Sequence, residues 1–487
     1  MQACRLRWLP KRSLRAPSLS YRSFSTSSHH ESSEDTFDLV CVGGGPAGLS
    51  LLAGLRASPI TSELKVALVE SQDLAKAKFN NTSPTTFANR CSSLTPASVD
   101  YLQRIGAWQH VDHSRVQPYQ EMEVWDGVTG SRISFDWATV ASPFASKSPA
   151  GGTIAYMIEN ANLTAALQAR LSELGGTTML SPARVEAITY GPPSTHGLDL
   201  STWPTLRLSS GRTLSTRLLV GADGASSPVR AFAGIASRGW DYNRMGVVAT
   251  LRLGGAPAHA RAAFQRFLPA GPVALLPLPG AAASLVWSTT GARAAALAKL
   301  SGEDFAAMVD AAFRLPPPEL AWLHGLEAGQ AGEVAWRRSV AGGPDGAKMP
   351  PEVVAVQQGS VAAFPLRMRH ADTYVAPRVA LVGDAAHTVH PLAGQGLNLG
   401  LADGAALVGA VEDAVEVGRD VSCLLGLEKY NAERYAANNA VLGVCDKLHK
   451  LYSWESGPVV AARSLGLSAV DKMGFLKGFL MRSAAGA

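Results

Sequence analysis

The chain has 487 residues and a mass of 51.0 kDa, enough for two or three structural units and more than one buried core. With 47% hydrophobic and 17% charged residues it has the composition of a globular protein, not of a disordered chain. Six of the basic residues behind the formal charge of +5 lie in the first 30 positions, where no acidic residue occurs. The remaining 38 basic and 39 acidic residues leave no basic run in the body of the chain, which argues against nucleic-acid binding.

The first 35 residues are typical of a mitochondrial transit peptide, because they are rich in arginine and serine. The basic residues of this leader are Arg5, Arg7, Lys11, Arg12, Arg15 and Arg22. Its apolar residues, which could share one face of a helix, are Leu6, Trp8, Leu9 and Leu14. A disordered basic tail is the alternative interpretation.

The sequence shows neither a metal-binding cysteine pattern nor a candidate transmembrane helix. The five cysteines are scattered without any C-x-x-C pair, which suits a reducing compartment and supports neither a zinc site nor an iron–sulfur site. The longest uncharged stretch, residues 267–292, contains four prolines and therefore cannot form a transmembrane helix.

The segment FDLVCVGGGPAGLSLLAGLRAS predicts a strand that ends at Gly43, a glycine turn and a helix over about residues 47–57. A second strand, KVALVE, closes on Glu70 and completes a βαβ unit of a parallel sheet. Gly43 permits a tight turn, Gly45 lets a pyrophosphate approach the backbone, and Gly48 lets helix and strand pack closely. Glu70 is placed to accept hydrogen bonds from ribose hydroxyls. This pattern predicts a dinucleotide site, with NAD and FAD both open.

The next motif, LLVGADGASSPVR at 218–230, is a strand that delivers Asp223 and Gly224, followed by Ser227 and Arg230. Taken alone, it is also typical of an ordinary strand followed by a capped helix, because Asp and Ser favour such positions.

The middle of the chain alternates strands and loops. Between about residues 247 and 290 the strands follow one another at hairpin spacing, which predicts a separate antiparallel sheet on the substrate side. The stretches PPP at 316–318 and AGGPDGAKMPP at 341–351 are predicted to be loops.

A third motif covers residues 378–398. RVALVGD predicts a strand that ends at Asp384, at the sheet edge where open α/β sheets bind ligands, and PLAGQG turns the chain into a helix that starts near Leu397. His387 and His390 lie between them. Metal binding is disfavoured because no third ligand is recognisable nearby, so we expect both histidines to line a cofactor site.

From residue 402 onward the pattern is helical. Near the C-terminus, residues 458–483 mix apolar with basic side chains, as an interfacial helix would, although packing against the protein's own body explains the pattern nearly as well. The apolar residues of this stretch are Val459, Leu467, Val470, Met473, Leu476 and Phe479, and the basic ones are Arg463, Lys472, Lys477 and Arg482.

The three motifs, in this order, resemble the class A flavoprotein hydroxylases with the para-hydroxybenzoate hydroxylase fold. The closer resemblance is to the mitochondrial ubiquinone-biosynthesis monooxygenases and their bacterial relatives; it covers most of residues 36–455, and the run from FPLRMRHADTYVAPRVALVGDAAHTVHPLAGQGLNLG onward is its most diagnostic part. It implies an α/β fold with an FAD-binding parallel sheet, an antiparallel substrate domain and C-terminal helices. The implied FAD-binding residues are Gly43, Gly45, Gly48, Glu70, Arg90, Asp223, Gly383, Asp384, Pro391, Gly394, Gly396, Leu397 and Asn398.

The same resemblance implies how the chain is divided. The FAD-binding domain is expected in three parts, the substrate domain in two, and the C-terminus as a helical region, with membrane contact left open for it. These segments are 36–120, 153–235 and 359–430 for FAD; 121–152 and 236–358 for substrate; and 431–487 for the helices.

The activity implied is hydroxylation at C5 of a polyprenylated 4-hydroxybenzoate-type ring with O2, in which the flavin carries the chemistry and no catalytic residue is assigned. Electrons are expected from ferredoxin and ferredoxin reductase. The location is expected to be the matrix side of the mitochondrial inner membrane, in a complex with other ubiquinone-biosynthesis proteins. Two alternatives stay open: an NAD(P)H-dependent hydroxylase or epoxidase of another phenol or lipid, and a non-catalytic escort of prenylated proteins.

Overall fold

The computed structural model describes residues 35–76, 83, 85–136, 152–193, 198–255, 261–341, 348–390 and 394–472. Residues from Thr36 onward form one compact unit, and residues 1–34 of the predicted leader lie outside the described residues. The four cysteines within the described ranges are free thiols. Throughout those ranges, none of the helices combines the length and apolar character needed to cross a bilayer.

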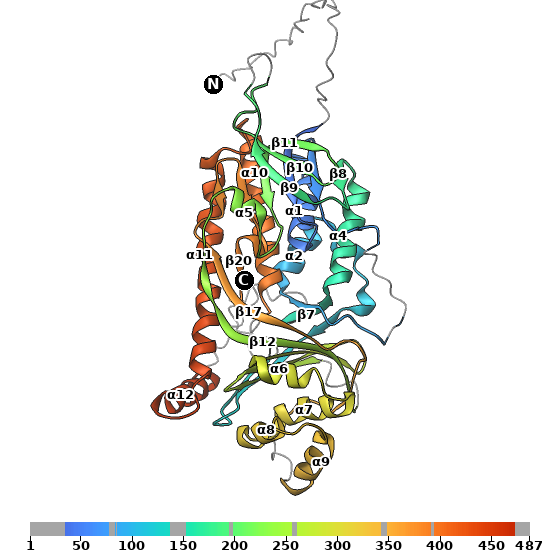
Figure 1. Ribbon diagram of the computed structural model, residues 1–487, viewed down its shortest axis with the longest axis vertical. Coiled ribbons are helices and arrows are strands. Elements are labelled where there is room, and N and C mark those ends of the chain that lie inside the picture. The colour runs from blue at the N-terminus through green and yellow to red at the C-terminus, as the bar shows by residue number, and fades with distance from the viewer. Residues whose placement is uncertain are drawn as a thin grey trace, which may run out of the picture. The chain divides into compact units, whose positions relative to one another are not determined.

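An eight-stranded sheet carries the glycine-rich turn (Figure 1). Its five central strands are parallel in the order β8-β2-β1-β11-β19, and β9, β10 and β18 are added antiparallel at the sides. The bounds are β1 Thr36–Val42, β2 Val66–Val69, β8 Thr177–Leu180, β9 Val185–Tyr190, β10 Pro204–Leu208, β11 Thr213–Gly221, β18 Val375–Ala376 and β19 Val379–Leu381. β1 and β2 are nearly continuous apolar runs because strands of a parallel sheet are buried on both faces.

Helices pack on this sheet and on one another. α1 contacts both α4 and α10, and α10 contacts α2 and α11, so α10 lies in the middle of the helical layer (Figure 1). The bounds are α1 Pro46–Ala57, α2 Pro96–Arg104, α4 Asn160–Leu174, α5 Pro228–Phe232, α10 Gly396–Glu416 and α11 Leu424–Tyr452. The predicted βαβ unit and the helix predicted to start near residue 397 are therefore confirmed, and α11 follows it as a second helix.

The second large sheet has nine strands in the order β20-β17-β12-β15-β14-β13-β5-β6, with β16 beside β12. The bounds are β5 Glu121–Asp126, β6 Arg132–Asp136, β12 Ser237–Leu253, β13 Ala262–Leu268, β14 Gly271–Leu278, β15 Ala282–Thr289, β16 Val353–Val356, β17 Ala362–Ala371 and β20 His387–Thr388. The predicted antiparallel sheet is confirmed with one exception. β5 pairs with β13 in parallel, which hairpin spacing alone could not reveal because the two strands are far apart in the chain.

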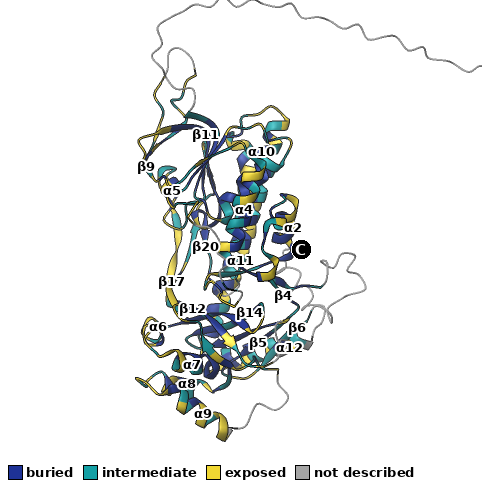
Figure 2. Cartoon of the chain, turned by 90° about the vertical axis from the view of Figure 1, so that its right-hand side faces the viewer, coloured by how far each residue is buried: buried dark blue, intermediate teal, exposed yellow. Residues whose placement is uncertain are grey.

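The helices α6 to α9 pack beside this sheet, and Figure 2 shows that α7 is largely buried whereas much of α9 is exposed. Their bounds are α6 Gly291–Leu297, α7 Gly302–Arg314, α8 Pro317–Leu323 and α9 Gln330–Ala341. The prediction of a loop at 316–318 was wrong. Pro316 is the N-cap residue of α8 and Pro317 opens the helix, a position that tolerates proline because its missing N–H would have no helical partner.

A three-stranded sheet, β3-β7-β4, accompanies the two large sheets. Its strands are β3 Cys91–Leu94, β4 Gln117–Tyr119 and β7 Ala155–Glu159. β12 and β17 pair over most of their length, and β17 also pairs with β20, which follows the Gly383 turn of the parallel sheet. The segment that leaves the parallel sheet at Gly383 therefore runs directly onto the antiparallel sheet.

The last described helix, α12 (Pro458–Lys472), packs against β6. Arg463 is buried and donates to both carboxylate oxygens of Asp126, at 2.8 and 3.1 Å. Leu467 and Val470 pack on the apolar cluster around Tyr452. For these three residues the interfacial interpretation was wrong, because the protein's own body covers them.

Candidate active site

Two of the three predicted glycines are required by close packing. Gly43 has φ +112°, and a Cβ added there would lie 2.2 Å from the carbonyl oxygen of Ala222. A Cβ on Gly48 would lie 2.2 Å from the carbonyl oxygen of Gly43. The turn after β1 therefore lies directly against the chain that leaves β11, which brings the first and second motifs together.

Gly45 plays a different part, because a Cβ added there would meet nothing within 4 Å. It is the N-cap residue of α1, whose first turn has neither a side-chain cap nor an acidic residue. Glu70 lies beside this turn and accepts a hydrogen bond from the Gly44 N–H at 2.6 Å. The open space at Gly45 and the uncapped N–H groups form a cradle for an anion such as a phosphate.

Asp223 follows β11 at the same sheet edge. Its Oδ2 accepts from the Val229 N–H at 3.1 Å, and Ser227 caps α5. The helix-capping interpretation of this motif is therefore correct. Its buried Oδ1, however, has no partner among the described residues, and burial raises the pKa of this carboxyl group. Arg230 donates to the carbonyl of Ala385 at 2.8 Å and so ties this motif to the third one.

The third motif forms a tight turn instead of the end of a strand. β19 ends at Leu381, and Gly383–Ala385 is a single 3-10 turn, so the prediction of a strand up to Asp384 was wrong. Gly383 has φ +60°, and a Cβ there would lie 3.2 Å from Cβ of Ala47 in α1. The Asp384 side chain is accessible from the surface, yet the surrounding protein desolvates it and raises its pKa.

A buried aspartate that the sequence reading missed holds this turn in place. Asp403 of α10 is fully buried and accepts four hydrogen bonds. The donors are the Gly383 N–H at 3.0 Å, His387 Nε2 at 2.6 Å, Arg434 Nε at 2.9 Å and Asn438 Nδ2 at 3.0 Å. An acidic residue in the apolar run GLNLGLADGAALVGAV was the signal that could have found it.

The start of α10 lies next to the same turn. Gly394, Gly396 and Leu397 are partly buried, α10 has no side-chain cap, and its first turn has no acidic residue. The Asn398 side chain is already engaged, because it accepts from the Thr95 N–H at 3.0 Å and donates to the Ser93 carbonyl at 2.8 Å. Only its main chain is therefore available to a cofactor. Pro391 lies outside the described residues.

Arg90 has an exposed side chain just before β3, and its carbonyl accepts from the Asn160 N–H at 3.0 Å. The segment before it is anchored by a buried pair that the sequence reading missed. Arg115 donates to both carboxylate oxygens of Glu159, at 2.6 and 2.9 Å, and its guanidinium lies 4.4 Å from the Phe87 ring centroid. The role of Arg90 toward FAD stays a prediction.

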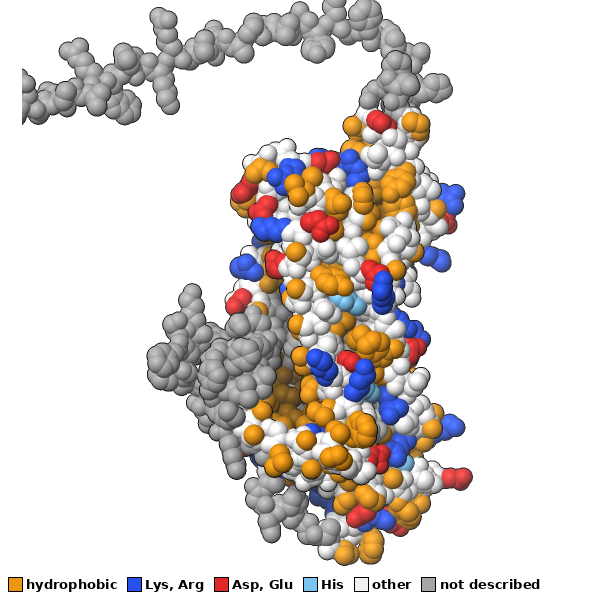
Figure 3. All heavy atoms as spheres, turned by 90° about the vertical axis from the view of Figure 1, so that its left-hand side faces the viewer, with side chains coloured by type: hydrophobic (Ala, Val, Ile, Leu, Met, Phe, Trp, Pro, Cys, Tyr) orange, Lys and Arg blue, Asp and Glu red, His pale blue; other side chains and the backbone are white. Residues whose placement is uncertain are grey.

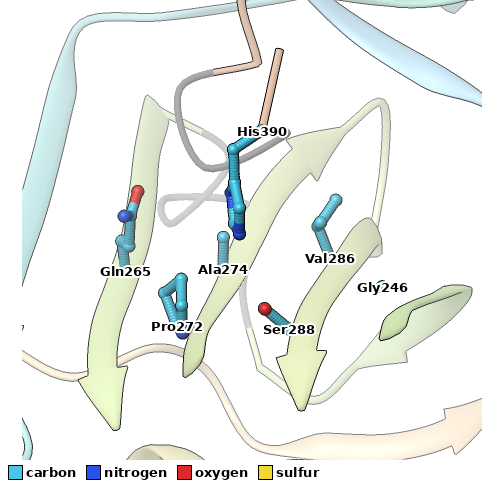
Figure 4. A pocket seen from close by; sticks show the side chains of 7 residues that line it. All are labelled: Gly246, Gln265, Pro272, Ala274, Val286, Ser288 and His390. Atoms are coloured by element: carbon cyan, nitrogen blue, oxygen red, sulfur yellow. The ribbon is translucent and has the colours of Figure 1, made fainter. Parts of the chain in front are cut away.

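The two histidines of the third motif have separate environments. His387 belongs to the Asp403 network and is buried. His390 is also buried, but it lines a small pocket above the antiparallel sheet. Figure 4 shows its imidazole extending toward strands β13, β14 and β15. The other residues of the lining are Gly246, Gln265, Pro272, Ala274, Val286 and Ser288.

Over the described ranges, no group of three or more His, Cys, Asp or Glu side chains could hold a metal ion. The residues present fit FAD instead. The cradle at Gly45 suits a pyrophosphate, and the orphaned Asp223 Oδ1 and accessible Asp384 suit hydroxyl donors. The uncapped start of α10 suits the charge that develops on a reduced flavin.

A parallel sheet with a glycine turn, a Gly-Asp turn facing it and an antiparallel sheet beside them define an FAD-dependent monooxygenase of the para-hydroxybenzoate hydroxylase type. Residues 36–301 and 346–443 match the family described as FAD binding domain. The structure of p-nitrophenol 4-monooxygenase from Pseudomonas putida has the same fold, with a TM-score of 0.64 at 18% identity over 92% of this chain and 97% of that one.

Curated relatives identify the family more closely. Mitochondrial ubiquinone biosynthesis monooxygenase COQ6 of Saccharomyces cerevisiae is 40% identical, covering 92% of this chain and 94% of its own length. The COQ6 protein of Schizosaccharomyces pombe is 38% identical, covering 92% of each chain. The chain belongs to the family of ubiquinone-biosynthesis flavin monooxygenases, and its cofactor is FAD. The alternative of a non-catalytic escort is therefore set aside.

Proposed function

We propose that this protein hydroxylates C5 of a polyprenylated 4-hydroxybenzoate-type ring during ubiquinone biosynthesis in mitochondria. The observation that carries the proposal is the cavity under His390, which lies on the segment that begins at the Gly383 turn. Because His390 follows the Gly383 turn in the chain, a ring bound against it would lie next to the predicted flavin site. The names of the relatives support the pathway and the organelle.

The chain's own residues would bind and orient the reactants. Gly45, Glu70 and Asp223 would hold the adenosine and pyrophosphate parts of FAD, and Asp384 with the start of α10 would hold the ribityl and flavin parts. Bound FAD, once reduced, activates O2 and supplies the oxygen atom that enters the ring. Pro272, Ala274 and Val286 give the cavity apolar walls, which exclude water from the ring.

The electron source is proposed to be ferredoxin with its reductase, and other ubiquinone-biosynthesis proteins are proposed partners. Purified protein with bound FAD, O2, reduced ferredoxin and a short-chain prenylated 4-hydroxybenzoate should give one product, hydroxylated at C5. NADPH without ferredoxin should not sustain turnover. The product is identified by mass spectrometry and NMR. If the FAD-loaded enzyme leaves the precursor unchanged, the proposed substrate is wrong. Turnover on NADPH alone contradicts the proposed electron donor.

A polyprenyl chain partitions into membranes, so we propose peripheral binding to the matrix side of the inner membrane. Figure 3 shows hydrophobic side chains around a hollow on one face of the molecule. Among the described residues of the C-terminal region, three large apolar side chains are exposed as well: Val444 at 57%, Trp454 at 57% and Leu465 at 73%. Val444 lies within α11, whereas Trp454 follows α11 and Leu465 lies in α12. Since Leu467 and Val470 pack inward, Trp454 and Leu465 are the residues of this region that we expect to contact lipid.

Replacing both Trp454 and Leu465 by serine should weaken binding to liposomes of inner-membrane composition by at least tenfold. Burial of one leucine side chain alone contributes about 1.5–3 kcal/mol. Co-sedimentation measures the effect, with Leu425→Ser as the matched control, because Leu425 is 75% exposed but lies in the first turn of α11, at the opposite end of that helix from Trp454. Equal loss in both variants, or none in either, counts against this membrane contact.

A further inference from the structure

The segment that leads to Arg90 is hydrogen-bonded to side chains of the antiparallel sheet. Gln357 follows β16, and its side chain binds both main-chain groups of Phe87. Its Oε1 accepts from the Phe87 N–H at 3.0 Å, and its Nε2 donates to the Phe87 carbonyl at 2.9 Å. The hydroxyl group of Thr250 in β12 donates to the same carbonyl at 3.2 Å. The glutamine therefore pairs with Phe87 as a residue of a neighbouring antiparallel strand would.

Gln357 is itself held in the antiparallel sheet. It begins a tight turn between β16 and β17, in which the Ser360 N–H donates to the Gln357 carbonyl at 3.1 Å. The Gln357 N–H donates to the Thr250 carbonyl at 2.8 Å. Asn89 binds the same turn, because its Nδ2 donates to the Ser360 carbonyl at 2.7 Å. This turn therefore binds the segment at two of its residues, Phe87 and Asn89.

The chain around the end of β7 binds the segment as well. Glu159, the last residue of β7, accepts from the Ala88 N–H at 2.6 Å. The Arg90 carbonyl accepts from the Asn160 N–H at 3.0 Å. Each of the residues 87–90 is therefore hydrogen-bonded to a residue outside the segment, which restricts the direction in which the Arg90 side chain extends.

After Arg90 the chain runs toward the predicted flavin end of the site. Ser93 lies three residues further on in β3, which is about 10 Å along an extended chain. The Ser93 carbonyl accepts from the Asn398 side chain at 2.8 Å, and a Cβ added to Gly394 would lie 3.8 Å from Ser93 Cβ. Asn398 and Gly394 lie where α10 begins. The exposed side chain of Arg90 therefore starts from a fixed main chain close to the predicted flavin site.

We propose that Gln357 is a positioning residue for FAD binding, because it fixes Phe87 and thereby directs the Arg90 side chain toward the cofactor. The antiparallel sheet thus contributes to the flavin site through a residue that binds the protein's own main chain. Without the Gln357 side chain, the N–H of the buried Phe87 loses its acceptor, and the segment has to shift to find another. The inference rests on the expected contact between Arg90 and FAD and is independent of the identity of the substrate.

A double-mutant cycle on the full-length chain tests the inference, with the Kd for FAD measured by flavin fluorescence. Gln357→Ala should raise this Kd about fivefold or more in the wild-type background but less than about twofold in the Arg90→Ala background, because Gln357 acts through Arg90. Gln358→Ala is the matched control, since Gln358 is the exposed neighbour in the same turn. It should leave the Kd within about twofold of the wild-type value.

Asn89→Ala gives a second cycle, because Asn89 is only partly buried and its loss leaves the pairing of Gln357 intact. It should show the same dependence on Arg90, which decides the matter if the Gln357→Ala protein does not fold. The inference is overturned if the substitutions weaken FAD binding equally in both backgrounds, if neither weakens it, or if Arg90→Ala binds FAD as the wild type does. No substrate is present in this experiment, so none of these results bears on the proposed hydroxylation.

Discussion

Replacing Gly48 by alanine should abolish FAD binding and destabilise the fold. The added Cβ would lie 2.2 Å from the carbonyl oxygen of Gly43 and 3.1 Å from Cys41 Sγ, and backbone atoms cannot rotate out of the way. Such overpacking costs about 3 kcal/mol, and its relief would move α1 away from β1. Urea unfolding gives the loss of stability, and the ratio of flavin to protein absorbance gives the loss of FAD.

Gly45→Ala, in the same turn, tests FAD binding separately from the stability of the fold. A Cβ at Gly45 meets no protein atom within 4 Å, so the free energy of unfolding of the FAD-free protein should stay within about 0.5 kcal/mol of the wild type. FAD affinity should still fall by at least tenfold, because the methyl group enters the space assigned to the pyrophosphate. If Gly45→Ala retains full FAD affinity, the phosphates do not lie there.

The elements that could be predicted from the sequence are those encoded by local patterns. The strand, turn and helix around Gly43 follow from an apolar run, a glycine triplet and helical periodicity within 22 residues. The helix that begins at Gly396 follows from the same kind of signal. These elements bring together the first, second and third motifs as expected, although the roles of their residues toward FAD stay predictions.

The residues that escaped prediction act across long stretches of chain. Ser288 and His390 lie more than a hundred residues apart in sequence and line the same pocket, and β15 and β20 belong to one sheet with β12 and β17 between them. The long strand β12 was predicted only from residue 247, since its first half, SRGWDYNRMG, is largely polar and largely exposed where it pairs with β17. Such contacts depend on strand register and sheet topology, and local hydrophobic periodicity predicts neither of them.

Local sequence patterns also failed to predict the buried ion pairs. Arg115 with Glu159, and Arg463 with Asp126, are each buried pairs between segments that are not neighbours in sequence. Arginine on a helix is ordinarily read as solvent-exposed, so Arg463 was read as an interfacial residue. Its partner Asp126 ends β5, which pairs with β6, the strand against which α12 packs.

Replacing Asp403 by asparagine should lower the free energy of unfolding at pH 7 by about 3–5 kcal/mol. The substitution removes the negative charge that compensates the buried Arg434 and weakens the acceptor of the Gly383 N–H. FAD affinity should fall as well, because Gly383 lies in the predicted flavin-binding turn. Asp413→Asn in the same helix is the control; its exposed ion pair with Lys429 at 2.5 Å should contribute no more than about 1 kcal/mol.

The pH dependence of the difference between wild type and Asp403→Asn follows from the pKa of Asp403. Burial opposes ionisation of this carboxyl group, but His387, Arg434 and Asn438 outweigh burial and hold its pKa below the ordinary value of 3.8. A carboxyl group with a lowered pKa in the folded state contributes its full stabilisation above its ordinary pKa and loses it as the pH falls toward the folded-state value. The stability difference should therefore be constant between pH 6 and 8 and shrink below about pH 4, as measured by urea unfolding. A difference that grew on acidification would mean that Asp403 is protonated in the folded protein, and the buried network would then have to be held by neutral hydrogen bonds alone.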